Sequence, residues 1–301
     1  MMRACNALGA YIVKVTRSCA EARYHVVGAR AFRFVTGFVL AYQLVSIIGQ
    51  WSLFFGADSL FETERFVDTF GVTHLSLFGI SGSVLWQGGI FAAAIIVYLL
   101  WALRGGVLIT LLTWWLNYSV HERCPGLWDG GDNLISILLV YSIALDFRPR
   151  SCEPLISPLR RLFHNAALLA CSLQICLLYF TAGLAKVPGK YWSNGTALYY
   201  VLASDEFGAT GFGEWAWSSP TILAILTWAP LMMQLTFPWV YFFGRPTPRR
   251  VLVVSAIVFH FGILVMMGLG TFAIFMIGAE LLLLSDADFM ALRLLPRPRG
   301  D

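Results

Sequence analysis

The chain has 301 residues, of which 58% are hydrophobic and 13% are charged. Ordinary soluble domains carry roughly 25% charged residues, so a water-soluble protein is excluded and an integral membrane protein is expected. The formal net charge of +4 gives no indication of a nucleic-acid partner, and the six cysteines have no zinc-type spacing, so no metal site is predicted.

Apolar stretches long enough to cross a bilayer, which takes about 20 residues, recur along the chain. The first begins near Phe34 after a basic N-terminal tail, which is typical of a membrane span and not of a cleaved signal peptide. The apolar block 251–284 is too long for one helix, and Gly268-Leu269-Gly270 can divide it by a tight turn. The last segment is short, so a spanning helix and a re-entrant helix both stay open. The predicted segments are 34–54, 84–103, 105–121, 133–147, 165–187, 220–244, 251–267 and 271–285.

The positions of the basic residues predict the orientation of these segments. Cytoplasmic loops carry an excess of Lys and Arg. With eight spans, the basic clusters of the N-terminal tail, of 148–161, of 245–250 and of 293–299 all fall on the cytoplasmic side. The sequence therefore predicts an all-α polytopic membrane protein with about eight transmembrane helices and both termini in the cytoplasm. Its expected parts are a basic tail over 1–33, a transmembrane domain over 34–285 and a basic tail over 286–301.

Two connections on the predicted outer side are long, namely 55–83 and 188–219. Both mix aromatic and polar residues, which is typical of helices that lie in a membrane interface. We expect short interfacial helices that roof a cavity open to the outside.

Lys186 stands where the fifth apolar segment ends, in YFTAGLAKVPGKYW. Tyr179, Gly183 and Lys186 are four and three residues apart, so they share one helical face. A glycine on that face lets another helix or a ligand approach closely. Two interpretations stay open, because Lys186 is either an amine held ready as a base or a lysine that snorkels to the outer headgroups. Trp192 follows as an interface anchor.

Two further ionisable residues lie in the last apolar block. Ionisable residues inside a bilayer are expensive and indicate function or a partner. His260 is near the middle of its segment, and Glu280 reaches a similar depth if the turn at Gly268-Leu269-Gly270 forms. A His260–Glu280 pair would lower the cost of burying either one. A structural hydrogen bond of His260 to another helix is the alternative.

The turn WDGGDN presents Asp129 and Asp132 on the predicted outer side, followed by Asn133. Paired carboxylates bind a cation, act as acid and base, or cap the next helix, and Asp132 is a plausible N-cap. His121 and Glu122 lie nearby and add a metal constellation as a further alternative, although no spacing rule defines it.

The segment YFTAGLAKVPGKYWSNGTALYY resembles the signature of the HTTM family, the horizontally transferred transmembrane domain shared with vitamin K-dependent gamma-carboxylases. In that family the lysine that Lys186 matches is thought to deprotonate the reduced vitamin. FHFGILVMMGLGTFAIFMIGAELLL is similar to the family's histidine helix and glycine–phenylalanine turn, with His260 and Phe272 at the matching positions. A second active-site histidine of the carboxylases has no match, since that turn reads WDGGDN, and the sequence ends soon after its last predicted span, where the carboxylases have a large lumenal region. The resemblance therefore does not imply gamma-carboxylation.

The pattern of WW, YS and DGGD looks more like a bacterial branch of the family, the sporulation-delaying protein B type, whose members are needed to mature a secreted peptide toxin. The resemblance implies a bacterial multi-pass membrane protein acting on an exported peptide, beside a small partner protein. A quinone-like cofactor is implied by the wider family.

Three functions stay open from the sequence. The leading one is a membrane-embedded peptide-modifying enzyme whose catalytic residues are Lys186, His260 and Tyr179. In it Lys186 acts as a base or charge anchor and His260 as its hydrogen-bonding partner. Its substrate-binding residues would be Asp129, Asp132, Asn133, Trp192 and Glu280. The alternatives are a permease or immunity-type binding protein without chemistry, in which Glu280 matters more than Lys186, and a scaffold that binds lipid or quinone.

Overall fold

The computed structural model describes residues 14–56, 59–60, 75–124, 126–204, 207 and 218–294. Within these ranges the regular structure is entirely helical, which confirms the predicted all-α class. The chain divides into two compact units. Unit 1 comprises 1–171 and 285–301, and unit 2 comprises 172–284.

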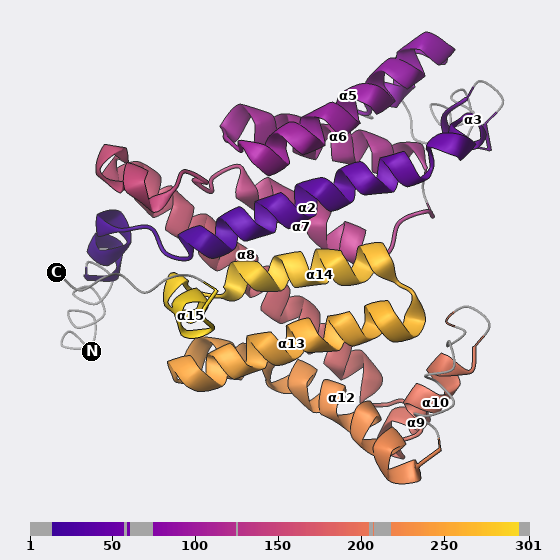
Figure 1. Ribbon diagram of the computed structural model, residues 1–301, viewed down its shortest axis with the longest axis vertical. Coiled ribbons are helices and arrows are strands. Elements are labelled where there is room, and N and C mark those ends of the chain that lie inside the picture. The colour runs from indigo at the N-terminus through magenta and orange to yellow at the C-terminus, as the bar shows by residue number, and fades with distance from the viewer. Residues whose placement is uncertain are drawn as a thin grey trace, which may run out of the picture. The chain divides into compact units, whose positions relative to one another are not determined.

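Unit 1 is a bundle in which α2 packs on α5, α5 on α6 and α6 on α7 (Figure 1). The α2–α5 contact is close because Gly37 has no side chain: a β-carbon there would lie 2.7 Å from the Ala102 Cβ. Phe32 packs edge-on against Trp101 beside this contact, with ring centroids 6.2 Å apart. The helices of unit 1 are α2 (Val26–Ser46), α3 (Trp51–Phe55), α5 (Val84–Leu103), α6 (Val107–Arg123), α7 (Gly130–Ser142), the first part of α8 (Pro158–Lys186) and α15 (Asp286–Ala291). Short 3-10 turns cover Ile48–Gln50, Leu77–Gly79 and Arg150–Leu155.

The first span begins at Val26, earlier than the sequence predicts, because the basic residues before Phe34 do not break the helix. Arg33 is buried within α2, where its guanidinium lies over the Phe147 ring and donates to the Leu103 carbonyl oxygen at 3.1 Å. The carbonyl bond and the aromatic ring partly compensate the buried guanidinium, whose Nε has no hydrogen-bond partner among the described residues, and the helix continues through Arg33. The boundary expected at residue 33 therefore does not coincide with a helix end.

In unit 2, α13 (Pro246–Met267) packs on α14 (Gly270–Leu283) and on α12 (Pro220–Phe243), and α8 runs antiparallel to α12 along a narrow seam. Tyr179 stacks on Phe237 with ring centroids 4.0 Å apart. One turn further along α8, Gly183 faces Gln234, and a β-carbon at position 183 would lie 3.1 Å from the Gln234 Cβ. This is the close helix approach that the sequence predicts for Gly183. The other helices are α9 (Lys190–Ser193) and α10 (Ala197–Leu202).

The last apolar block is divided where the sequence predicts. α13 ends at Met267, Gly268 adopts the left-handed conformation with φ 68°, and α14 begins at Gly270. The two helices then pack side by side (Figure 1). Glycine takes this conformation at no steric cost, which explains why the helix ends there.

In the described part of the chain, five helical segments are long and apolar enough to cross a membrane: Val26–Phe55, α5, α8, α12 and α13. Large apolar side chains on them are exposed, among them Leu85 at 88% and Phe243 at 80%, as expected for lipid-facing positions. The protein is therefore a multi-pass helical membrane protein. The sequence predicts eight spans, and the remaining three segments form the shorter helices α6, α7 and α14, with 17, 13 and 14 residues.

Helices in the two long connections are partly described. α9 and α10 lie in 188–219, whereas in 55–83 the 3-10 turn Leu77–Gly79 is described and α3 ends at its first residue, Phe55. Residues 61–74 and 208–217, on which the rest of the predicted interfacial structure falls, lie outside the described residues.

Candidate functional site

Three polar side chains from three helices meet in the interior of unit 2. His260 of α13 lies with its Nδ1 2.6 Å from Glu280 Oε1 of α14. The Tyr179 hydroxyl of α8 donates to the same Glu280 oxygen and lies 3.3 Å from His260 Nδ1. The predicted His260–Glu280 pairing is therefore present, and Tyr179 joins it.

The surroundings of this triad are dry and aromatic. Tyr179, His260 and Glu280 are 1%, 2% and 0% exposed. The Phe237 ring stacks on Tyr179, and Phe272 meets the His260 ring edge-on at 5.7 Å. Such packing fixes the three polar groups in one arrangement.

Glu280 has an unused acceptor in this interior. Its Oε1 receives both contacts, whereas Oε2 is buried and has no hydrogen-bond partner among the described residues. A buried carboxylate oxygen without a donor is costly, so a proton or a polar ligand at this position would stabilise it. The triad can therefore hold and pass one proton among a phenol, an imidazole and a carboxyl group.

Lys186 lies seven residues beyond Tyr179, about 10 Å along α8 and on the same face. Its Nζ donates to the Ala182 carbonyl oxygen at 3.0 Å and to Gln234 Oε1 at 3.1 Å. It also lies 5.4 Å from the centre of the Trp192 ring. Within the described residues no carboxylate pairs with this amine. The amine is partly buried and held by an amide, a carbonyl and an indole.

The polar groups of unit 2 thus form two separate clusters, one around Tyr179 and one around Lys186, two helical turns apart on α8. His260 contacts Tyr179, Glu280 and the Ala256 carbonyl oxygen of its own helix, whereas Lys186 donates to Gln234 and to its own helix. Gln234 was not foreseen, although a glutamine inside the apolar segment 220–244 is a signal of the kind that identified Glu280.

Asp129 and Asp132 form a capping box at the start of α7, in unit 1. Asp129 is the N-cap, and its Oδ1 accepts from the backbone N–H groups of Gly131 and Asp132. The prediction of Asp132 as N-cap is wrong by one helical turn, because Asp132 is the third residue of the helix and accepts from the Asp129 N–H at 3.0 Å. The side chain of Asn133 is exposed and belongs to no hydrogen-bonded group described here.

Asp132 is also tied to neighbouring helices. Its Oδ1 accepts from Gln43 Nε2 at 2.8 Å and lies 3.9 Å from His121 Nε2. The His121 ring stacks on Trp128. These contacts give Asp132 a structural role that residue spacing alone did not reveal. Among the described residues, no three histidine, cysteine or carboxylate side chains are grouped as a metal site.

A second buried carboxylate, Asp146, was missed from the sequence. It receives hydrogen bonds from Arg23 at 3.1 Å, from Arg148 at 2.5–3.1 Å and from Arg160 at 2.6 Å. Burial raises the pKa of this carboxyl, but the hydrogen bonds from Arg148 and Arg160 outweigh burial and hold the pKa well below its usual range. Asp146 is therefore the ionised centre of an arginine cluster in unit 1.

Comparisons with known proteins place these residues in context. The HTTM domain family matches residues 134–289, just over half of the chain. The Bacillus subtilis (strain 168) protein YitO is 26% identical over 59% of this chain and 60% of its own length. The sporulation-delaying protein SdpB of the same organism is 24% identical over 50% of this chain and 49% of its own length. The chain thus spans between about half and three fifths of these relatives. No solved structure matches. The family match contains Tyr179, Lys186, His260 and Glu280 but not Asp129 or Asp132.

Proposed function

Because this chain belongs to the HTTM family, we propose that it is a cell-membrane protein that modifies an exported peptide during its maturation, at the outer face of the bilayer. One observation carries the proposal: a partly buried lysine without a carboxylate partner among the described residues stands two turns from a buried phenol–imidazole–carboxyl triad, on the same helical face. The chain is similar to a sporulation-delaying protein, and the resemblance to that branch of the family, whose members mature a secreted peptide toxin, suggests a peptide as the substrate class.

In this proposal the amine of Lys186 is the base. Gln234 Oε1 and the Trp192 ring can stabilise the ammonium form once the amine has accepted a proton. No counter-ion among the described residues has to be displaced first. The Tyr179–His260–Glu280 triad, which begins two turns before Lys186 on α8, would store a proton or return it.

A quinol cofactor, implied by the resemblance to gamma-carboxylases, is compatible with these side chains. Trp192 offers an aromatic face and Gln234 a hydrogen-bonding amide beside the Lys186 amine. When bound, such a group would supply an acidic hydroxyl and reducing equivalents, and the role of Lys186 would be to take the hydroxyl proton.

The finer topology is part of the proposal. With α6, α7 and α14 crossing the membrane as short helices, the chain has eight spans and both termini in the cytoplasm. The arginines at 148–161 and 245–250 support this orientation. Lys186 then lies at the outer end of α8, where an exported peptide arrives.

The experiment is mass spectrometry of the exported peptides of the source cells, with and without the gene for this protein. We expect one peptide whose mass or cleavage pattern changes when the gene is deleted and returns when it is restored. An unchanged set of peptides, together with changed uptake of a small solute, would instead support the permease alternative.

A further inference from the structure

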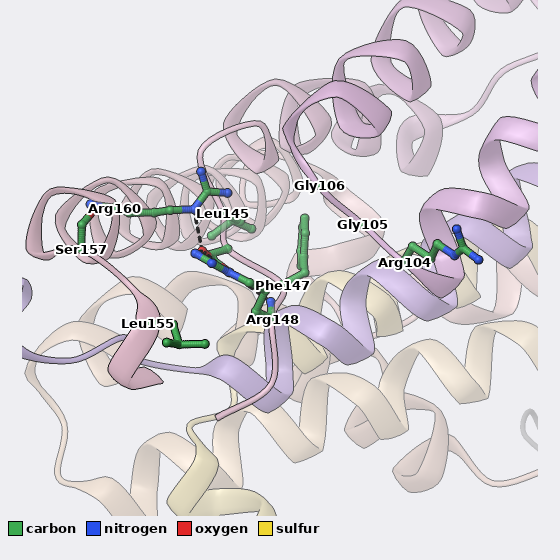
Figure 2. Close-up of a pocket in the computed structure, with 10 residues that line it drawn as sticks. Arg104, Gly105, Gly106, Leu145, Phe147, Arg148, Leu155, Ser157 and Arg160 are labelled. Atoms are coloured by element: carbon green, nitrogen blue, oxygen red, sulfur yellow. Dashed lines mark hydrogen bonds and ion pairs between the residues drawn. The ribbon is translucent and has the colours of Figure 1, made fainter. Parts of the chain in front are cut away.

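A cavity of about 510 Å³ in unit 1 has no role in the proposed function. Its wall combines three arginines with one carboxylate, so positive charge is in excess. The lining residues are Arg104, Gly105, Gly106, Leu145, Asp146, Phe147, Arg148, Leu155, Ser157 and Arg160. Figure 2 shows Arg148 and Arg160 close together, whereas Arg104 lies apart and its guanidinium points away from them.

The arginines keep hydrogen-bond donors available. Arg148 uses its Nε and Nη2 on Asp146, and Arg160 uses its Nε. The remaining terminal nitrogens of both, and the whole guanidinium of Arg104, make no hydrogen bond or ion pair with the described residues. Guanidinium groups arranged in this way match the oxygens of a phosphate group.

The Gly105-Gly106 turn leads from the same wall into α6, and the Gly105 N–H already donates to the Trp101 carbonyl oxygen at 3.1 Å. Gly106 is the N-cap of α6, with φ 116°, and no side chain caps that helix. The first N–H groups of a helix attract anions, and those of α6 follow directly after the two glycines of the wall.

The position of the cavity, at the ends of two apolar helices, favours a lipid as its ligand. Arg104 caps the end of α5, and Ser157 and Arg160 flank the start of α8, so two membrane-crossing helices end at the wall. Next to these residues Leu103, Leu108 and Leu159 are 60%, 70% and 62% exposed, as expected of side chains that contact acyl chains. A basic pocket bordered by lipid-facing leucines at the ends of spans matches a phospholipid headgroup with its acyl chains beside it.

We propose that this cavity binds a phosphate group, presented by an anionic phospholipid headgroup. The free terminal nitrogens of Arg148 and Arg160 hold the phosphate oxygens, Arg104 adds its positive charge at the rim, and the acyl chains lie along the exposed leucines. The proposal does not depend on the function assigned to unit 2.

The test uses the full chain purified in a mild detergent. Retention of added phosphatidylglycerol is measured by native mass spectrometry, against phosphatidylcholine and against inorganic phosphate as competitor. Arg104→Gln and Arg160→Gln are the test variants, since Arg104 has no hydrogen-bond or ion-pair partner among the described residues and a glutamine at 160 can still donate to Asp146. Arg245→Gln, an exposed arginine outside the cavity, is the matched control. Melting curves establish that the variants fold.

We expect phosphatidylglycerol to be retained over phosphatidylcholine and each test variant to weaken it about five-fold, the equivalent of about 1 kcal/mol per arginine. The control should change little. If millimolar inorganic phosphate displaces the lipid completely and raises the melting temperature by itself, the phosphate site stands and its ligand is soluble. Equal retention of both lipids without any effect of phosphate, or equal weakening by Arg245→Gln, would overturn the proposal.

Discussion

His260 Nδ1 and Glu280 Oε1 lie 2.6 Å apart across the hairpin of α13 and α14, with both side chains buried. The αL conformation of Gly268 makes the two helices run back along each other. Removing one partner of such a pair leaves the other without compensation in a medium of low dielectric constant. The hairpin and the pair therefore support each other.

We predict that His260→Leu or Glu280→Leu alone lowers the free energy of unfolding by about 3 kcal/mol, because one polar group stays buried and unpaired. The double variant should lose much less than the sum of the two. The free energy of unfolding of the two single variants and of the double variant is measured in mixed detergent micelles. Additive losses would show that the two residues act independently.

Gly183→Ala should destabilise unit 2 by roughly 1–3 kcal/mol, because the new methyl group would lie 3.1 Å from Gln234 and Leu235. It should also move Gln234 away from Lys186. Gly262→Ala is the matched control, since a β-carbon there meets nothing within 4 Å. That control should stabilise α13 by about 0.5–1 kcal/mol. Thermal denaturation of both variants in the same detergent checks the contrast, and equal shifts would contradict the seam between α8 and α12.

Asp129→Ala should lower stability by about 0.5–2 kcal/mol through loss of the α7 cap. Asp129→Ser keeps a side-chain acceptor and should retain most of that stability. If Asp129 only caps the helix, peptide maturation survives in Asp129→Ser. Loss of maturation in a stable Asp129→Ser protein would instead assign the carboxylate to substrate binding.

The stability of unit 1 should fall in acid through Asp146. Because its pKa is lowered in the folded protein, its contribution is complete above the pKa of an unfolded aspartate, about 3.9, and is lost as the pH falls toward the folded value. Melting temperatures between pH 7 and pH 3 should therefore drop less in Asp146→Asn than in the unmodified protein, although Asp146→Asn starts lower. Glu21→Gln, which removes an exposed ion pair with Arg17, is the control and should follow the unmodified protein. An identical acid response in Asp146→Asn would contradict this.

Much of the fold could be predicted from residue patterns. Long apolar runs located the helices, and the glycines at 268 and 270 located the hairpin, because both are local features. The His260–Glu280 pair followed from the hairpin, since equal depth on neighbouring helices brings side chains together.

What the sequence did not reveal depends on contacts between distant segments. Arg23 reaches Asp146 across 123 positions, and Gln234 reaches Lys186 across 48. Residues so far apart in the sequence belong to no common helical repeat, so the sequence pattern does not indicate that they meet. The role of Asp132 was misplaced by one turn, because Asp129 and Asp132 are both suitable caps and only the backbone geometry distinguishes them. The start of α2 was misplaced because charged residues end an apolar pattern without ending a helix.

The most direct measurement compares the exported peptide from cells that carry Lys186→Met, Lys190→Met or the unmodified protein, using mass spectrometry with the amount of membrane protein matched. Lys190 lies four residues beyond Lys186 and is exposed, so it controls for the loss of a positive charge at this end of α8. We predict that Lys186→Met abolishes maturation at normal protein level and that Lys190→Met matures the peptide as the unmodified protein does. Normal maturation in Lys186→Met would contradict the proposed base.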